Sequence, residues 1–239
     1  MNHLVSALQD ARAKGEAARI TAQDLPRAVE EAYAAGLSQA PEVAAWKIGG
    51  ANPWSRQVFA NAEVFFGPLT PREVAVGTDV LSLAGLHAPL AEPELMLELG
   101  DDLEAELPFA RMGLGFEIPA SVLPDGAKSL LTGQMADRAG AGALWIGAVQ
   151  PFDAARCGAA FVSHFRRNGA AAAEGGSGNI IGGPVGAAKE FLALARRHGM
   201  PLAQGQWIAT GGLSPAVPAA PGDLLECRAM DMEVRLRLA

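Results

Sequence analysis

The stretch AEPELMLELG, residues 91–100, holds three glutamates, Glu92, Glu94 and Glu98, among residues that are otherwise apolar. This composition predicts a β-strand, in which residues two apart point to the same face. The glutamates then share one face with Met96, while the leucines between them share the other face and point to a core. Neighbouring ionised carboxylates repel each other, so the glutamate face needs bulk water or a cation. A set of oxygen ligands suits Mg²⁺ or Mn²⁺.

A further carboxylate, Glu117 in GLGFEIPA, lies downstream in a similarly apolar setting. If this segment forms the adjacent strand, Glu117 reaches the same place, and a metal site with three carboxylates is one interpretation. The alternative is a strand with one face open to solvent, on which the glutamates are hydrated, as charged side chains usually are. The spacing alone leaves both interpretations open.

The elements that position these side chains follow from the pattern of apolar and turn residues. Residues 4–11 and 21–36 have helical spacing, with Thr21 as a candidate N-cap and Gly36 as a candidate stop. Over residues 46–99, short apolar runs separated by Gly, Pro and Asn are typical of strands and turns. We expect two helices followed by a mainly β region.

Helical signals return at residues 151–169 and 184–199, each with basic residues and a glycine at its end. Between them, residues 168–179 (NGAAAAEGGSGN) have the composition of a mobile, low-complexity connection. Residues 231–239 alternate apolar and charged side chains, which predicts a half-buried strand.

The fold class that these elements predict is α+β. We expect an N-terminal helical region over residues 1–45 and a β-rich core with two packed helices over residues 46–239, the two forming one compact unit. A chain of 239 residues with 50% hydrophobic content can bury a core of that size.

The net charge of −7 argues against nucleic acid or an anionic membrane as a partner, because such partners select for clustered Lys and Arg. A small molecule is the expected ligand. Cys157 and Cys227 are the only cysteines and lack the spacing of a zinc or redox motif. We find neither the apolar run of a signal peptide nor a stretch long enough to cross a membrane, and therefore expect a cytoplasmic protein.

Seven segments follow one another along almost the whole chain in a recognisable succession. They are AAWKIGG, FFGPL, AEPELMLEL, GLGFEIP, ADRAGAGALWIG, GGPVGAAKEFLALARRHGMPLAQGQWIATGG and PAAPGDLLECRA. In order and spacing they resemble the 2-keto-4-pentenoate hydratase and 4-oxalocrotonate decarboxylase branch of the fumarylacetoacetate hydrolase superfamily. The resemblance implies a mixed, β-rich core with a rolled or barrel-like sheet.

The resemblance also implies a divalent metal, Mg²⁺ or Mn²⁺, that chelates a 2-oxo acid substrate. Glu92 and Glu94 match the family's Glu-x-Glu motif, and Glu117 matches its later acid. Glu98 lies outside the motif, either exposed or supporting the ligands. Lys47 in WKIG matches an active-site lysine that holds a substrate carboxylate or takes part in proton transfer. The alternative is a strand-end lysine whose ammonium group reaches water.

Two further segments match the walls of the family's substrate pocket. Phe66 and Gly67 match one wall, and Thr210, Gly211 and Gly212 match a turn that contacts the substrate. The two glycines of that turn also fit a simple tight turn between strands.

The chain departs from the family pattern at several places. Residues 118–120 (Ile-Pro-Ala) stand where an aspartate and an arginine commonly follow the third acid, and Gly212 stands where a serine is usual. The usual Asp-Asn pair is Asp137-Arg138, and only Glu63 is available for an acid often found before the FG motif. Arg138 either grips a distal substrate carboxylate or forms a salt bridge.

The resemblance favours a hydratase of aromatic-compound degradation, a lyase that acts on a 2-hydroxydienoic acid. A 4-oxalocrotonate-type decarboxylase is the runner-up, and hydrolysis of a carbon–carbon bond in a diketo acid is a third possibility. The alternative to an enzyme is a non-catalytic protein of the same fold, which would serve as a ligand-binding or partner subunit. We expect a homo-oligomer, or association with a related family member.

Overall fold

The computed structural model describes residues 2–239, which form two sheets and a set of helices. The strands are β1 (Ala45–Gly49), β2 (Phe65–Leu69), β3 (Val74–Val76), β4 (Val80–Leu81), β5 (Leu90–Leu99), β6 (Phe109–Ile118), β7 (Ala143–Pro151), β8 (Val162–Arg167), β9 (Ala170–Gly176), β10 (Trp207–Ala209), β11 (Val217–Pro218), β12 (Leu224–Ala229) and β13 (Met232–Leu238). The α-helices are α1 (Asn2–Lys14), α2 (Val29–Ser38), α3 (Pro53–Phe59), α4 (Asp125–Lys128), α5 (Leu131–Ala136), α6 (Ala154–Gly158) and α7 (Gly183–Arg197). Short 3₁₀ turns are η1 (Ala22–Asp24), η2 (Pro71–Glu73), η3 (Arg138–Gly140) and η4 (Ser177–Asn179).

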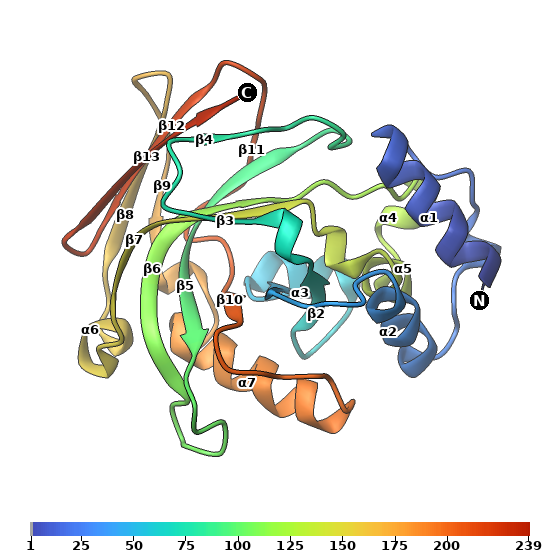
Figure 1. Ribbon diagram of the computed structural model, residues 1–239, viewed down its shortest axis with the longest axis horizontal. Coiled ribbons are helices and arrows are strands. Elements are labelled where there is room, and N and C mark those ends of the chain that lie inside the picture. Colours follow the sequence, from blue (N-terminus) through green and yellow to red (C-terminus); the bar gives the residue numbers. More distant parts are fainter. Residues whose placement is uncertain (1) are drawn as a thin grey trace.

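The larger sheet carries the residues that the sequence singles out. Its strand order is β2-β1-β10-β5-β6-β7-β3, with β11 added on β5. The long strands β5 and β6 run antiparallel at its centre, and the sheet curls around them into a half-barrel (Figure 1). This confirms the α+β class that the predicted elements indicate and the rolled sheet that the resemblance implies.

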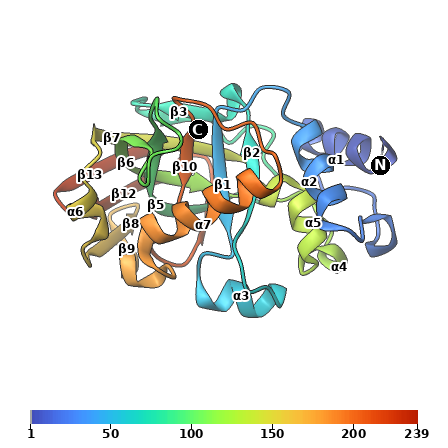
Figure 2. The ribbon, with the colours of Figure 1, turned by 90° about the horizontal axis from the view of Figure 1, so that it is seen from below.

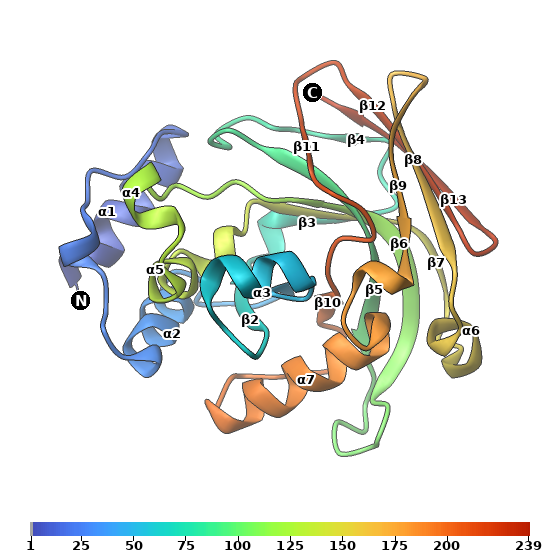
Figure 3. The same ribbon diagram turned by 180° about the vertical axis from the view of Figure 1, so that it is seen from behind.

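The smaller sheet has the order β4-β13-β12-β8-β9 and packs against β6 and β7 (Figure 3). The C-terminal strand is confirmed as β13. Along it, the apolar residues are buried and the charged residues between them are exposed, so one face covers the neighbouring sheet.

Four helices, α1, α2, α4 and α5, lie together at one end of the molecule (Figures 1 and 2). The second predicted helix begins later than its N-cap signal suggests. Thr21 and Asp24 form a capping box around the single turn η1, the chain is extended at Leu25, and α2 starts only at Val29. The boundary between residues 1–45 and 46–239 stays a prediction.

Helix α7 confirms the helix expected over residues 184–199 and packs against β1 and β5 (Figure 2). Its Phe191 ring lies 5.7 Å from that of Trp46 and 5.1 Å from that of Phe66. These rings join one side of the large sheet to the helix within the main hydrophobic core. Among the described residues, no helix combines the length and the apolar character needed to cross a membrane.

The expected helix over residues 151–169 is wrong. Only α6 forms, and β8 follows it, with Ser163 and Phe165 buried and the alternate side chains exposed. Asn168 and Gly169 both have positive φ, 53° and 78°, and turn the chain into β9, which pairs with β8. An Asn-Gly pair between strands is a strong hairpin signal. The connection expected over residues 168–179 is therefore also wrong, because β9 and η4 occupy it.

Candidate metal centre

Three glutamate carboxylates meet on the large sheet because β5 and β6 pair in the right register. Glu92 of β5 lies directly opposite Glu117 of β6, and Glu94 lies opposite Gly115. One oxygen from each of Glu92, Glu94 and Glu117 lies within 4.8 Å of the others. Glu94 and Glu117 are buried, and Glu92 is partly buried.

Lys47 reaches this cluster from β1. Its Nζ lies 2.9 Å from Glu117 Oε1, and the lysine is itself buried. Strand β1 is two strands away from β5, across the short strand β10, so the curl of the sheet brings the lysine and the carboxylates together. The structure thus gathers four of the predicted site residues in one place.

The electrostatics of the cluster reflect burial and crowding. Burial, followed by the charge of Glu117, raises the pKa of Glu92 to about 7, and burial with the charges of Glu117 and Glu92 raises the pKa of Glu94. For Lys47, burial alone would lower the pKa of the ammonium group. The three carboxylates outweigh burial, so the pKa of Lys47 is raised. The raised pKa values of Glu92 and Glu94 mark negative charge that the protein alone does not balance, whereas the raised pKa of Lys47 marks an ammonium group that the carboxylates stabilise.

The turn after β10 closes one side of the cluster. Gly211 donates a backbone hydrogen bond of 2.8 Å to Glu94 Oε2, and Thr210 Oγ1 donates one of 2.6 Å to the carbonyl of Leu95. Gly212 packs so closely on Glu92 that a Cβ there would lie 2.6 Å from its Oε2. The turn contacts the carboxylates themselves, which is more than a connection between strands requires.

Gly67 and Phe66 lie on opposite faces of β2. Gly67 pairs with Lys47, whereas Phe66 pairs with Ile48 and points away from the carboxylates. The Phe66 ring stacks on Tyr33 at a centroid distance of 4.3 Å within the main core. The structure therefore brings Gly67 beside Lys47 and places Phe66 behind the strand.

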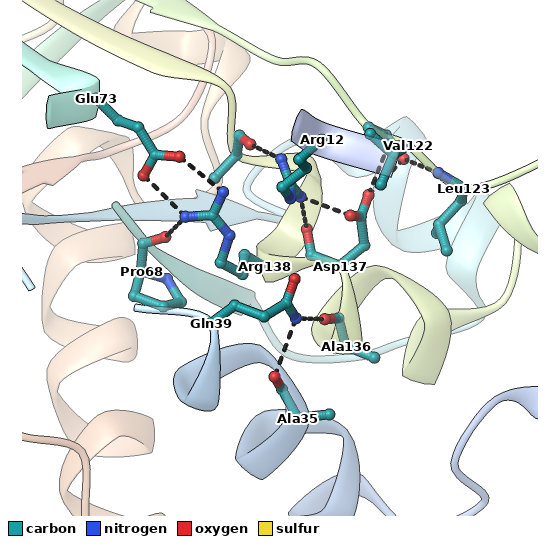
Figure 4. A network of polar contacts seen from close by, with 12 residues as sticks. Arg12, Ala35, Gln39, Pro68, Glu73, Val122, Leu123, Ala136, Asp137 and Arg138 are labelled. Atoms are coloured by element: carbon teal, nitrogen blue, oxygen red, sulfur yellow. Dashed lines mark hydrogen bonds and ion pairs between the residues drawn. The ribbon is translucent and has the colours of Figure 1, made fainter. Parts of the chain in front are cut away.

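Arg138 is bound to the protein itself. Its guanidinium donates two hydrogen bonds of 2.8 Å to the carboxylate of Glu73, and it contacts the carbonyl of Pro68 at 3.4 Å (Figure 4). The side chain is 3% exposed. Of the two roles that the sequence leaves open, the structure displays the salt bridge, in a buried form.

Two other acids also have partners outside the cluster. Glu98 is buried and forms an ion pair with Arg111, whose guanidinium lies over the ring of Trp207. Glu98 is therefore not exposed. Glu63 pairs with Arg197 at the surface, 2.8 Å away, so it does not supply an acid next to Lys47.

Several supporting residues carry no signal in the sequence. Asn52 and Asn179 both donate to the carbonyl of Gly212, at 3.2 Å and 2.9 Å, and so hold the turn against Glu92. Arg12 reaches the same end of the sheet through Asp137 (Figure 4). These partners lie far apart in the chain, and a single asparagine or arginine forms no motif, so their contacts could not be predicted from the sequence.

A scan against models of protein families found no match. Among curated proteins, the chain is 28% identical over 200 residues to a 2-keto-4-pentenoate hydratase of Paraburkholderia xenovorans, covering 80% of this chain and 74% of that protein. A Pseudomonas putida protein named 2-keto-4-pentenoate hydratase 3 matches with the same identity and coverage.

The fold resembles solved structures that bind divalent metals. A 4-oxalocrotonate decarboxylase from Pseudomonas putida G7, complexed with magnesium and adipate, superimposes with a TM-score of 0.85 at 18% identity, over 99% of this chain and 96% of that one. A fumarylpyruvate hydrolase from Pseudomonas aeruginosa, with Mn²⁺ and pyruvate, gives 0.62 at 14% identity, over 81% and 88%. Sequence relatives and fold together support the chain's place in the fumarylacetoacetate hydrolase superfamily, on its 2-keto-4-pentenoate hydratase and 4-oxalocrotonate decarboxylase branch.

Proposed function

We propose that the protein is a divalent-metal-dependent lyase that acts on a small 2-oxo or 2-hydroxydienoic acid, with 2-keto-4-pentenoate hydration as the first candidate reaction. The observation that carries the proposal is the cluster of Glu92, Glu94 and Glu117, with oxygens within 4.8 Å of one another, beside the buried Lys47. The hydratase names of the sequence relatives support the choice of reaction.

The charge and chemistry of the cluster fit a divalent cation. Three ionised carboxylates against one ammonium group leave two negative charges in a largely buried place, which is costly without a counter-ion. All three donors are oxygens, the ligands that Mg²⁺ and Mn²⁺ prefer. Glu92, Glu94 and Glu117 would hold the ion, which when bound would supply Lewis-acid polarisation of the 2-oxo acid.

We assign Lys47 to charge and proton handling. Its ammonium group can donate a hydrogen bond to a substrate carboxylate, or exchange a proton with the reacting carbon chain at Nζ. Hydration of a 2-hydroxydienoate requires that the enol hydroxyl lose a proton while carbon gains one, before water adds to the remaining double bond. A buried lysine 2.9 Å from a carboxylate suits the transfer of such a proton.

Three other reactions or roles are the rivals. A 4-oxalocrotonate-type decarboxylase would use the same residues while carbon dioxide leaves, and a hydrolase would cleave a carbon–carbon bond in a diketo acid. A ligand-binding or partner subunit would bind the metal without turnover. The non-catalytic role is supported by the apolar residues that follow Glu117, namely Ile118, Pro119 and Ala120. They replace the aspartate and arginine that are common at this place in the family.

The test is to follow the ultraviolet absorbance of 2-hydroxypenta-2,4-dienoate and of 2-oxo-3-hexenedioate, each with Mg²⁺, Mn²⁺ or a chelator, and to identify products by mass. A hydratase consumes the first compound and adds water, with no turnover in chelator. Loss of carbon dioxide from the second identifies the decarboxylase. Metal binding without turnover of either compound would contradict both.

A further inference from the structure

The turn at residues 137–140 has an unusual backbone. Arg138, Ala139 and Gly140 follow one another with φ values of 54°, 55° and 72°. Two of these three residues carry a side chain in a region that favours glycine, so the conformation persists only where surrounding contacts fix it. The contacts that fix this turn lead in two directions (Figure 4).

One set of contacts joins the turn to helix α1 and to the chain after β6. Arg12 donates to the carbonyl of Ala141 at 2.5 Å and to both the carbonyl and Oδ1 of Asp137, at 2.8 and 2.5 Å. The other oxygen of Asp137 accepts from Ser121 Oγ at 2.7 Å and from the N–H of Val122 at 3.1 Å. Asp137 is fully buried, so this carboxylate depends on Arg12 for its counter-charge.

The other set of contacts joins the turn to β2 and η2. The guanidinium of Arg138 grips Glu73, and its backbone carbonyl packs on Gly67, where a Cβ would lie only 1.9 Å from that oxygen. Gly67 in turn pairs with Lys47 in the sheet.

The turn therefore connects the surroundings of β1 and β6, the two strands whose side chains form the Lys47–Glu117 ion pair. On one side it holds the backbone that follows Glu117 on β6, and on the other it supports β2, the neighbour of Lys47 on β1. Arg12, from a different element, fixes the turn between them.

We infer that Arg12 is a positioning residue for the Lys47–Glu117 pair, acting through Asp137 and the turn at residues 137–140. The inference rests on the proposed function for its effect on turnover, but the placement of Lys47 is measurable without turnover. A displacement of about 1 Å in a catalytic group costs up to about 100-fold in rate. The metal ligands are held by the pairing of β5 with β6, so the affinity for the metal should change little.

The experiment compares Arg12→Lys with wild type. Lysine keeps the charge but lacks the planar fork that serves three acceptors at once. The matched control is Arg167→Lys, since Arg167 pairs with buried Asp223 at 2.8 Å in the smaller sheet, away from the cluster. Wild type has four lysines and each of these two variants has five, so the Nζ signal of Lys47 in metal-free, ¹⁵N-lysine-labelled protein is assigned in each background by its loss when Lys47→Arg is added.

We expect Arg12→Lys to shift or broaden the Lys47 signal, to lower kcat about tenfold and to change KM and Mn²⁺ affinity by less than about threefold. Arg167→Lys should change none of these. If Arg12→Lys folds poorly, the isosteric Glu73→Gln serves instead, because it removes the charge that Arg138 pairs with. This variant should shift the Lys47 signal in the same way.

An unchanged Lys47 signal in Arg12→Lys or in Glu73→Gln overturns the inference, as does a loss of kcat no larger than that of Arg167→Lys. If wild type turns over neither 2-oxo acid, the proposed function fails, and the comparison of Lys47 signals alone decides the positioning role.

Discussion

At the scale of single residues, the carboxylate cluster holds more negative charge than its one lysine can balance. Glu92, Glu94 and Glu117 crowd within 4.8 Å, and Lys47 pairs with only one of them at ion-pair distance. Raised pKa values for Glu92 and Glu94 follow from burial and this crowding. A bound cation and Lys47 therefore interact with the same carboxylates. A substitution of Lys47 should leave the metal ligands in place, so metal binding and turnover can be measured separately.

Substitution of Lys47 by Met should separate metal binding from turnover. The change removes a positive charge next to the carboxylates, so Mn²⁺ affinity should hold or rise, while kcat should fall by about 100-fold or more because the proton donor is lost. Thermal denaturation should show a lower Tm for the metal-free variant, recovered when Mn²⁺ is added, because the metal replaces the missing counter-charge. Weaker Mn²⁺ binding together with unchanged kcat would contradict this assignment of Lys47.

Gly67→Ala should be costly. A Cβ at this position would lie 1.9 Å from the Arg138 carbonyl, so β2 and the turn would have to separate, at a cost of about 1–3 kcal/mol in the free energy of unfolding. Denaturant unfolding would measure this loss. The control is Gly126→Ala on α4, where a new Cβ meets no atom within 4 Å and helix propensity improves. Equal stability of the two variants would argue against the close packing.

At the scale of elements, period-two alternation in residues 91–100 was enough to predict β5, its two faces and its carboxylates. The register that sets Glu92 opposite Glu117 was not predictable, since it depends on how two strands pair. Arg138 and Glu73 are 65 residues apart, and nothing local links them. By contrast, the missed hairpin had a local signal in Asn168-Gly169, but Gly169 also fits the end of a helix, and the Ala- and Gly-rich composition of residues 168–179 resembles a connection.

The hairpin itself is testable at Gly169. Its φ of 78° favours glycine, so Gly169→Ala should lower the free energy of unfolding by about 1 kcal/mol, and Tm by about 2–4 °C in a chain of this size. Calorimetry should show that Gly158→Ala, at an open position without positive φ, has a smaller effect. Because the hairpin lies in the smaller sheet, metal binding should not change in either variant.

At the scale of the whole molecule, the curled sheet collects residues from distant parts of the chain at one point. Lys47 arrives from β1, the glutamates from β5 and β6, and Gly211 from the turn after β10. Helix α1 adds Arg12 from outside the sheet (Figures 1 and 4). The resemblance of seven segments in order predicts the fold and the carboxylates. It does not predict the contact of Arg12 on α1 with Asp137, because these residues are 125 positions apart and no sequence motif links them.

Calorimetric titration of Mn²⁺ into wild type, Glu94→Gln and Glu98→Gln tests the metal centre most directly. We expect one ion per chain in wild type and affinity weaker by about tenfold or more in Glu94→Gln, which loses a charged ligand. Glu98→Gln is the matched control, because Glu98 lies on the same strand but pairs with Arg111, and it should bind Mn²⁺ as wild type does. Absence of binding in wild type, or an equal loss in both variants, would contradict a metal held by Glu92, Glu94 and Glu117.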